Sequence, residues 1–357
     1  MTGGSPWATR ELADLLAANG LADVPEVPFE HDGWSGATLT ALDGPGGRFI
    51  LKRTSWAADW IARSTRDHAL REAVLAADPV ALPHPLAAAH LGAAADGTTA
   101  AILMPDLSAS LIPWDAGNGG ANVVEGATLE RVLRAMAAIH GTPWATIRSQ
   151  STDPVAPGWP WCPVRERLEL LSRASAARYA AGGLWVGERF LGGWDAFDAL
   201  ATPAARVLIA ELTDDPSPIL AALARLPPTG LHGDLKLANV ALLADGRASC
   251  IDWQLTTFAP VAVELGWFLV ANVAQLSGSP DETLEAYRSA LLDIDAGAVI
   301  DDWGAQRDLA VLAGLLLRGW RKGLDAASGA RLPTGASAEE DLRWWCEEAV
   351  AAADRRL

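Results

Sequence analysis

The sequence predicts an α+β protein of two lobes, in which a small N-terminal lobe is built on antiparallel strands and a larger C-terminal lobe is mainly helical. Three observations lead to this prediction. The chain has 357 residues, enough to bury two hydrophobic cores. Turn residues and β-favouring runs are concentrated before residue 107. Beyond that point, apolar residues recur mostly at helical spacing.

The expected N-terminal lobe begins with a helix over residues 9–20, because Thr9 precedes the apolar pattern and an Asn-Gly pair ends it. Turn signals such as Asp43-Gly44 divide residues 27–53 into three antiparallel strands. Residues 57–77 have the spacing of one helix, which Asp78-Pro79 should end. Residues 86–107 predict two further strands around an Asp-Gly turn.

In the expected C-terminal lobe, helical patterns cover residues 129–141, 165–183 and 188–201. One β interruption follows them. Residues 239–243 and 247–252 alternate as two short strands, and the Ala-Asp-Gly turn between them predicts a hairpin.

The composition restricts the classes of partner. A net charge of −16 disfavours a ligand held through the phosphates of DNA or RNA. The three cysteines lie far apart, which predicts free thiols rather than a zinc or redox centre. The N-terminus lacks a signal-peptide pattern, and the apolar runs are shorter than a bilayer span. We therefore expect a cytoplasmic protein with no nucleic-acid or membrane partner.

The segment "LHGDLKLANV", residues 231–240, places Asp234 and Asn239 on one short loop before the predicted hairpin. Alone this is a weak signal, because Asp and Asn are common in turns. However, Asp252 ends the second strand of the hairpin, which should return it to the side of Asn239. An amide and a carboxylate oxygen are ligands that suit Mg²⁺.

Other charged residues fit phosphoryl transfer from a nucleotide. In that reaction a loop carboxylate accepts a proton from the attacking hydroxyl and a lysine holds the nucleotide. Lys236 could approach a transferred phosphate or be an exposed loop lysine. Lys52 ends an apolar strand, and Glu72 is the only glutamate between it and residue 124. Either residue alone would fit a surface role, but together they fit an ion pair. His232 is better explained as a structural histidine than as an acid-base group.

Arg318 lies inside the apolar stretch "LLLRGWRKG". It is either paired with a buried carboxylate or directed into a substrate cleft, and the sequence does not decide between these alternatives. The chain also has 16 tryptophans against 2 tyrosines. Most tryptophans are expected in the core, and some could line such a cleft.

The residues described above resemble the protein-kinase signature of a strand lysine, a helix glutamate, a His-x-Asp-x-x-x-x-Asn loop and a later metal-binding Asp. More closely, "LHGDLKLANV" with "CIDWQ" is similar to the aminoglycoside phosphotransferase family and its choline-kinase-like relatives. The resemblance covers residues 25 to 275 approximately. It departs from the family at Glu264, where an Asp is usual, and in "DGWSGAT", which has fewer glycines than a nucleotide-covering loop.

The resemblance implies a bilobal protein-kinase-like fold with an N-terminal lobe over 1–104, a C-terminal lobe over 105–357 and a hinge at 103–107. It also implies roles for individual residues. Asp234 would be the catalytic base, with Lys236 beside it, and Asn239 and Asp252 would be the Mg²⁺ ligands. Lys52 would contact the phosphates, with Glu72 as its ion-pair partner. Further nucleotide contacts would come from Gly33, Ser35, Gly36, Asp106 and Leu107.

The implied activity is transfer of the γ-phosphate of ATP or GTP to a hydroxyl of a small molecule, with an antibiotic as the favoured acceptor. A protein acceptor is disfavoured, because an apolar helix follows Asp252 where a long activation segment would stand. A metabolic kinase for a sugar or amino alcohol is the first alternative. A non-catalytic nucleotide-binding pseudokinase is the second, and a metal-dependent phosphohydrolase ranks last because it gives Lys52 and Glu72 no purpose.

Overall fold

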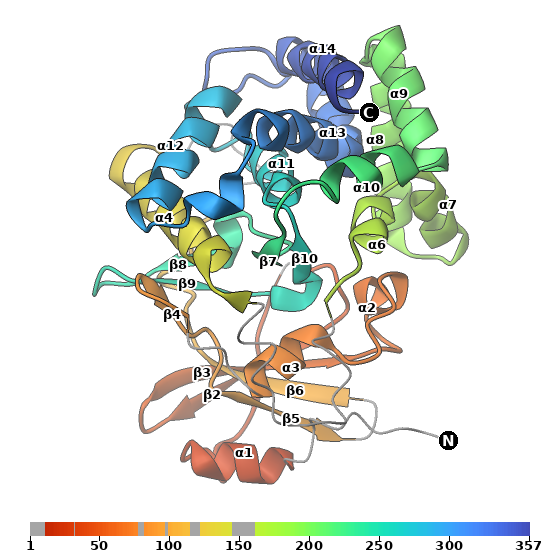
Figure 1. The fold of residues 1–357 in the computed structure, drawn as a ribbon. Helices are drawn as coiled ribbons and strands as arrows, with labels where there is room; N and C mark the ends of the chain where they lie inside the picture. The colour runs from red at the N-terminus through yellow and green to blue at the C-terminus, as the bar shows by residue number, and fades with distance from the viewer. Residues whose placement is uncertain (1–10, 32, 78–81, 97–98, 115–121, 145–160) are drawn as a thin grey trace.

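The computed structural model describes residues 11–31, 33–77, 82–96, 99–114, 122–144 and 161–357. It has two lobes, with the strands of the N-terminal lobe below the helices of the C-terminal lobe in Figure 1. The predicted α+β fold class is confirmed. The cap expected at Thr9 and the helix stop expected at Asp78-Pro79 lie outside the described residues.

The N-terminal lobe contains an antiparallel sheet in the order β1-β2-β3-β6-β5. Its strands are β1 (Val27–Pro28), β2 (Thr38–Gly44), β3 (Gly47–Ser55), β5 (Gly92–Asp96) and β6 (Thr99–Pro105). The tight β2–β3 hairpin pairs Gly44 with Gly47, whose φ of 121° is accessible to glycine. Both the three-stranded start and the later pair of strands are therefore as predicted.

Apolar side chains cover both faces of this sheet. On one face, Leu51 and Leu103 pack with Leu15 of α1 (Leu12–Ala18). On the other face, Ile50 and Ile102 pack with alanines of two short helices. The interior strand β6 is buried along most of its length, which explains its continuous apolar sequence.

The single helix predicted over 57–77 is wrong, because the structure has α2 (Trp60–Ser64) and α3 (Arg71–Ala77) instead. The chain between them turns through positive φ at Arg66 and Leu70. Two aspartates begin the two helices. Asp59 accepts hydrogen bonds from the first turn of α2, and the Asp67 carboxylate accepts the backbone N–H of Arg71 at 3.0 and 2.9 Å. These caps compete with one continuous helix, although the apolar spacing does not reveal them.

The C-terminal lobe is mainly helical, as expected. Its helices include α4 (Gly126–Gly141), α6 (Val164–Glu169), α7 (Arg173–Ala181), α8 (Trp185–Leu200), α9 (Pro203–Asp214), α10 (Ser217–Leu223), α11 (Ala262–Ala271), α12 (Pro280–Asp293), α13 (Trp303–Ala327) and α14 (Ala338–Arg356). The pattern over 165–183 is divided between α6 and α7 because Ser172 caps the second helix.

Two central helices, α11 and α13, pack closely in the C-terminal lobe. A Cβ atom at Gly266 would lie 2.2 Å from the backbone oxygen of Ala310, so only glycine allows this approach. Almost every side chain of α11 is buried. The helix therefore forms a rigid support behind the loop that follows β7 (Thr229–Leu231).

The predicted hairpin is present as β8 (Val240–Leu242) and β9 (Ala248–Cys250), which pair Val240 with Cys250. A short strand β4 (Leu86–Ala87), which the sequence did not predict, pairs in parallel with β9. A strand from the first third of the chain thus joins the hairpin of the C-terminal lobe. Strand β10 (Thr257–Ala259) then returns beside β7.

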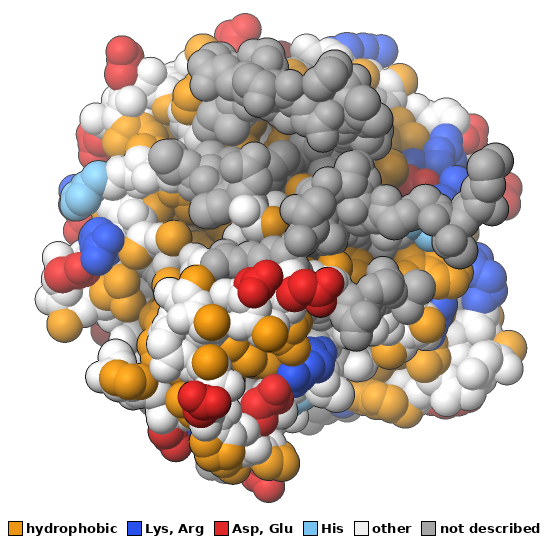
Figure 2. All heavy atoms as spheres, turned by 90° about the horizontal axis from the view of Figure 1, so that it is seen from below, with side chains coloured by type: hydrophobic (Ala, Val, Ile, Leu, Met, Phe, Trp, Pro, Cys, Tyr) orange, Lys and Arg blue, Asp and Glu red, His pale blue; other side chains and the backbone are white. Residues whose placement is uncertain are grey.

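Acidic and basic side chains are interspersed on the described part of the face shown in Figure 2. The three cysteines are free and buried, as predicted. Among the described residues, no helix combines the length and the apolar character needed to cross a membrane.

Candidate active site

The loop after β7 carries Asp234, and its path depends on Gly233. This glycine has a φ of 85°, and an added Cβ atom would lie 1.8 Å from the backbone oxygen of Leu255. Only a residue without a side chain permits that contact. The close approach holds the loop against the segment that directly follows Asp252.

Glu264 on α11 organises the backbone of this loop from below. Its buried carboxylate accepts the N–H groups of His232 at 3.0 Å and Gly233 at 2.6 Å, and His140 lies 2.8 Å from it. Burial alone would raise the pKa of Glu264, but the hydrogen bond from His140 and the nearby histidines hold it below its ordinary value. The carboxylate therefore stays ionised and fixes several loop donors.

Two further side chains hold the loop through its backbone. The Asn272 side-chain oxygen accepts the N–H of Leu237 at 2.8 Å, and Arg167 Nε donates to the oxygen of Gly233 at 2.9 Å. Sequence reasoning assigned no role to Glu264, Asn272 or Arg167. The available signal was a charged or amide side chain within or directly after an apolar helix, as in "VELGWFLVAN".

His232 is completely buried beneath the loop. Its Nε2 lies 3.0 Å from the oxygen of Ile251, and its Nδ1 accepts the N–H of Asp234 at 3.3 Å. Both contacts are satisfied by the neutral ring with its proton on Nε2. Burial also lowers the pKa of His232, although nearby carboxylates oppose this. The geometry fits the structural role favoured for this histidine.

The side chains of Asn239 and Lys236 surround one oxygen of Asp234. Asn239 Nδ2 lies 3.4 Å and Lys236 Nζ 3.5 Å from Asp234 Oδ2, and Asn239 also donates to the Asp234 backbone oxygen at 2.9 Å. The other oxygen, Oδ1, is buried and has no hydrogen-bond partner among the described residues. A carboxylate oxygen held in place without a partner can accept a proton from a bound hydroxyl group.

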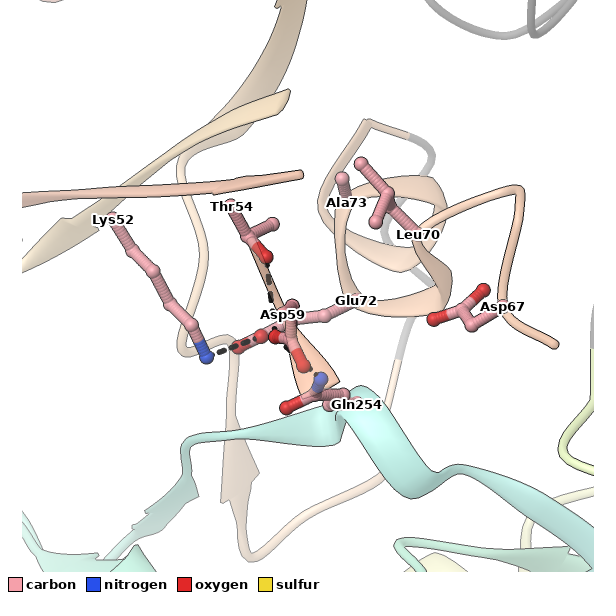
Figure 3. A pocket seen from close by; sticks show the side chains of 8 residues that line it. All are labelled: Lys52, Thr54, Asp59, Asp67, Leu70, Glu72, Ala73 and Gln254. Carbon is pink, nitrogen blue, oxygen red and sulfur yellow. Dashed lines mark hydrogen bonds and ion pairs between the residues drawn. The ribbon is translucent and has the colours of Figure 1, made fainter. Parts of the chain in front are cut away.

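Lys52 of β3 contacts Glu72, the partner predicted for it, and also Asp252, which was predicted only as a metal ligand. Its Nζ lies 2.6 Å from Glu72 and 2.8 Å from Asp252, and Figure 3 shows it pointing toward Glu72. Lys52 is only 8% exposed. Burial opposes its charge, but the two carboxylates raise its pKa above the ordinary value. Burial would raise the pKa of Asp252, but the Lys52 ammonium lowers it to about 2, and Lys52 likewise lowers the pKa of Glu72. The three groups are therefore all ionised.

Asn239 and Asp252 are brought together by the hairpin, as predicted, because the N–H of Ile251 donates to the backbone oxygen of Asn239 at 3.0 Å. Among the described residues, no group of three His, Cys, Asp or Glu side chains is placed to bind a metal without other ligands. An amide and a carboxylate nevertheless fit Mg²⁺, which takes its remaining ligands from phosphates and water.

A second polar contact near Lys52 joins the lobes. Asp59 accepts a hydrogen bond from Gln254 Nε2 at 2.7 Å and another from Thr54 at 3.2 Å, as drawn in Figure 3. Burial raises the pKa of Asp59 despite these contacts. Gln254 directly follows the "CIDW" segment, yet sequence reasoning did not single it out.

The segment around Gly33, Ser35 and Gly36 is attached to α2. The backbone oxygen of Ser35 accepts the N–H of Trp60 at 3.1 Å, and Ser35 Oγ accepts the N–H of Ala37 at 3.4 Å. Gly36 has a φ of 97°, which favours glycine. The loop thus lies beside the N-terminus of α2, with contacts that support its backbone.

In the predicted hinge, Asp106 donates its backbone N–H to the oxygen of Arg48 at 2.9 Å. That bond continues the β3–β6 pairing and occupies one of the two backbone donors, of Asp106 or Leu107, that were expected to face a nucleotide. Leu107 is left as the hinge residue whose N–H has no acceptor in the described part of the chain. The structure therefore favours Leu107 over Asp106 for a backbone contact.

A two-lobed α+β fold with a buried lysine-glutamate pair and a loop aspartate beside it defines a kinase-like phosphotransferase. The model of the phosphotransferase enzyme family matches residues 26–309. The chain belongs to this family and is a small-molecule phosphotransferase. No curated protein matches it in sequence.

Solved structures with similar folds include aminoglycoside phosphotransferases and choline kinase. The aminoglycoside phosphotransferase of Alicyclobacillus acidocaldarius is 16% identical with a TM-score of 0.43, over 91% of each chain. A putative aminoglycoside phosphotransferase of Ralstonia eutropha is 15% identical with a TM-score of 0.44, over 98% of this chain and 100% of its own. Choline kinase of Cryptosporidium parvum is 11% identical with a TM-score of 0.49, over 94% and 88% respectively.

Proposed function

We propose that the protein transfers the γ-phosphoryl group of ATP or GTP to a hydroxyl group of a small molecule. One observation carries the proposal. The unpartnered Oδ1 of Asp234 lies on a loop that is fixed from several sides, next to a hairpin whose Asp252 binds Lys52. A base and a phosphate-binding cation on opposite lobes are what transfer between two bound substrates requires.

The reaction follows from these positions. The acceptor hydroxyl gives its proton to Asp234, its oxygen bonds to the γ-phosphorus, and the bond from that phosphorus to the bridging oxygen breaks to release the nucleoside diphosphate. Lys52 holds the α- and β-phosphates, and Glu72 keeps it in place. Lys236 neutralises charge that develops on the transferred group.

In this proposal Asn239 and Asp252 hold Mg²⁺. The ion would neutralise charge on the phosphates when it is bound. The ammonium of Lys52 already contacts one oxygen of Asp252, whose side chain is 34% exposed, so the carboxylate remains accessible from the cleft.

For the nucleotide itself, we propose that Gly33, Ser35 and Gly36 cover the phosphates, and that Leu107 offers a backbone donor to the purine. Asp106 would then shape the hinge over 103–107. This hinge separates the lobes proposed at 1–104 and 105–357.

An antibiotic remains the favoured acceptor, with a metabolic sugar or amino alcohol as the alternative. Only residues 253–261 separate Asp252 from α11, which is too short for a platform that binds a protein acceptor. A pseudokinase is disfavoured, because Lys52 and Asp234 keep the charged side chains that catalysis needs. We also propose a cytoplasmic location, where nucleoside triphosphates are available.

The test is a mass-spectrometric screen in which antibiotics, sugars and amino alcohols are incubated with the protein, Mg²⁺ and each nucleotide. We expect a gain of one phosphoryl group on at least one compound. The Asp234→Asn variant should lose the transfer by about a hundredfold or more. Asp245→Asn, which changes an exposed turn residue paired with Arg247, should leave it unchanged. Equal transfer by wild type and Asp234→Asn would exclude the proposed base.

A further inference from the structure

Two arginines beside Asp234 have hydrogen-bond donors without a partner in the part of the chain that the structure describes. Arg167 of α6 is 1% exposed, and after its Nε contact with Gly233 both of its Nη atoms have no partner. Arg318 of α13 is partly buried, and its Nε has no partner either. Neither guanidinium forms an ion pair with a carboxylate in the described part of the chain.

The two guanidinium groups are held by the same aromatic ring. The Cζ atoms of Arg167 and Arg318 lie 4.1 and 4.5 Å from the ring centre of Trp267 on α11. The backbone of α13 leaves helical geometry at Arg318 itself, with φ −139° and ψ 22°. Stacking fixes a planar guanidinium while leaving its edge free for hydrogen bonds.

Within the described ranges, no carboxylate directly balances the charges of this pair. Burial lowers the pKa of Arg167, and burial with the neighbouring Arg321 lowers that of Arg318 to about 9. Asp234 is the carboxylate that opposes both effects most strongly. However, no direct bond joins Asp234 to either arginine, and its Oδ1 also has no partner. Unused donors and an unused acceptor thus lie near one another.

We propose that Arg167 and Arg318 bind an oxyanion of the acceptor, a carboxylate or a phosphate, next to Asp234. The proposal rests on the function proposed above and narrows its substrate class. A carboxylate or phosphate accepts the forked donors of guanidinium groups and removes the cost of burying them unpaired. A polycationic acceptor would instead add positive charge beside two unpaired cations. The acceptor is therefore a hydroxyl compound that also carries an acidic group.

The transferred phosphoryl group is the other possible source of an oxyanion, and a binding experiment separates the two. The melting temperature of the full chain is measured with malonate as the probe. The measurement is repeated with a non-hydrolysable ATP analogue and excess Mg²⁺, so that the phosphate positions are filled. We expect malonate to raise the melting temperature in both conditions. A rise that disappears once the nucleotide analogue is bound would assign the arginines to the nucleotide and overturn the proposal.

Variants show whether the two arginines cause the rise in melting temperature with malonate. Arg318→Gln should remove most of the malonate effect, and Arg318→Lys should restore part of it. Arg167→Lys should weaken the malonate effect as well. If the Arg167→Lys variant does not fold, the comparison of Arg318→Gln with Arg318→Lys still tests the proposal. Arg173→Gln is the control, because Arg173 is paired with Asp195 and Asp198 on the surface. No malonate effect in the wild type, or the same effect in Arg318→Gln, would refute the oxyanion site.

Transfer assays then use hydroxycarboxylic acids matched with their methyl esters. The acid of a pair should be phosphorylated at least about tenfold more efficiently, as kcat/KM, and Arg318→Gln should abolish that preference. If esters are phosphorylated as well as acids, the anionic subsite is wrong while the proposed kinase activity stands. If no compound is phosphorylated but malonate binds as described, the proposed function is what has failed.

Discussion

At the scale of single residues, Lys52 shows how burial and pairing combine. A lysine with 8% exposure would lose its charge in an apolar environment, but Glu72 and Asp252 keep it protonated. The two partners come from different lobes, so the ammonium can contact both only when the lobes lie in this relative position. His90 adds a contact of 3.4 Å to the other oxygen of Glu72. The lysine is thus oriented before a nucleotide binds, which lowers the cost of binding.

His232 predicts how stability depends on pH. Burial lowers its pKa in the folded protein, whereas the unfolded chain takes up a proton below about pH 6.5. The folded state therefore binds fewer protons, so its stability is complete above that pH and falls as the pH decreases toward the folded-state pKa. We expect the melting temperature to fall between about pH 7.5 and 5.5, and to fall less in His232→Gln. Identical pH profiles would show that another group controls this range.

At the scale of elements, the sheet and the hairpin could be predicted because their signals are local. Turn residues such as Asp43-Gly44 and Ala-Asp-Gly set strand ends, and apolar runs fill the strands between them. The break between α2 and α3 could not be predicted in this way. There the Asp67 carboxylate accepts the N–H of Arg71 in place of a backbone carbonyl, within a segment whose apolar spacing continues.

The site could be predicted only in part for a similar reason. Lys52 and Glu72 carry opposite charges whose pairing follows from the chemistry that they would perform, and the hairpin places Asp252 beside Asn239. Glu264 and Arg167 instead act on the backbone of the loop, from helices far away in the sequence. Their importance depends on which N–H and C=O groups the fold leaves unpaired, and the sequence alone does not give this.

The loop between β7 and β8 can be tested through its glycine. Gly233→Ala adds a Cβ atom in collision with Leu255 and places alanine at positive φ. We expect it to lower the free energy of unfolding by more than about 2 kcal/mol and to abolish transfer, because Asp234 would move. Gly246→Ala is the matched control, since it has a φ of 89° but open space around it. It should cost about 1 kcal/mol and keep activity, as measured by urea unfolding and transfer assays. Equal losses in both variants would show that backbone strain, and not the contact with Leu255, is the cause.

At the scale of the whole molecule, three of the connections between the lobes meet at one short segment of the chain. Lys52 binds Asp252, Asp59 accepts from Gln254, and strand β4 pairs with β9. Figure 1 shows the hairpin at the junction between the sheet and the helices. Since all three connections end within or just after this hairpin, the segment that carries Asp252 is also the segment that sets how the lobes face one another.

The contact between Asp59 and Gln254 should therefore couple stability to nucleotide binding. Gln254→Leu leaves a buried carboxylate with one donor fewer, and should lower the free energy of unfolding by about 1–2 kcal/mol. Asp59→Asn keeps the cap of α2 while removing the charge, so it should cost less.

In a double-mutant cycle the two changes should fall short of additivity by about 1 kcal/mol, because each removes the same interaction. Both single variants should also bind the nucleotide more weakly, since the lobes lose one of the contacts near Lys52, and titration calorimetry measures this loss. Fully additive stability effects with unchanged nucleotide affinity would mean that the contact only fills space at the junction. In that case the remaining contacts between the lobes, among them Lys52 with Asp252 and the β4–β9 pairing, would be sufficient to align them.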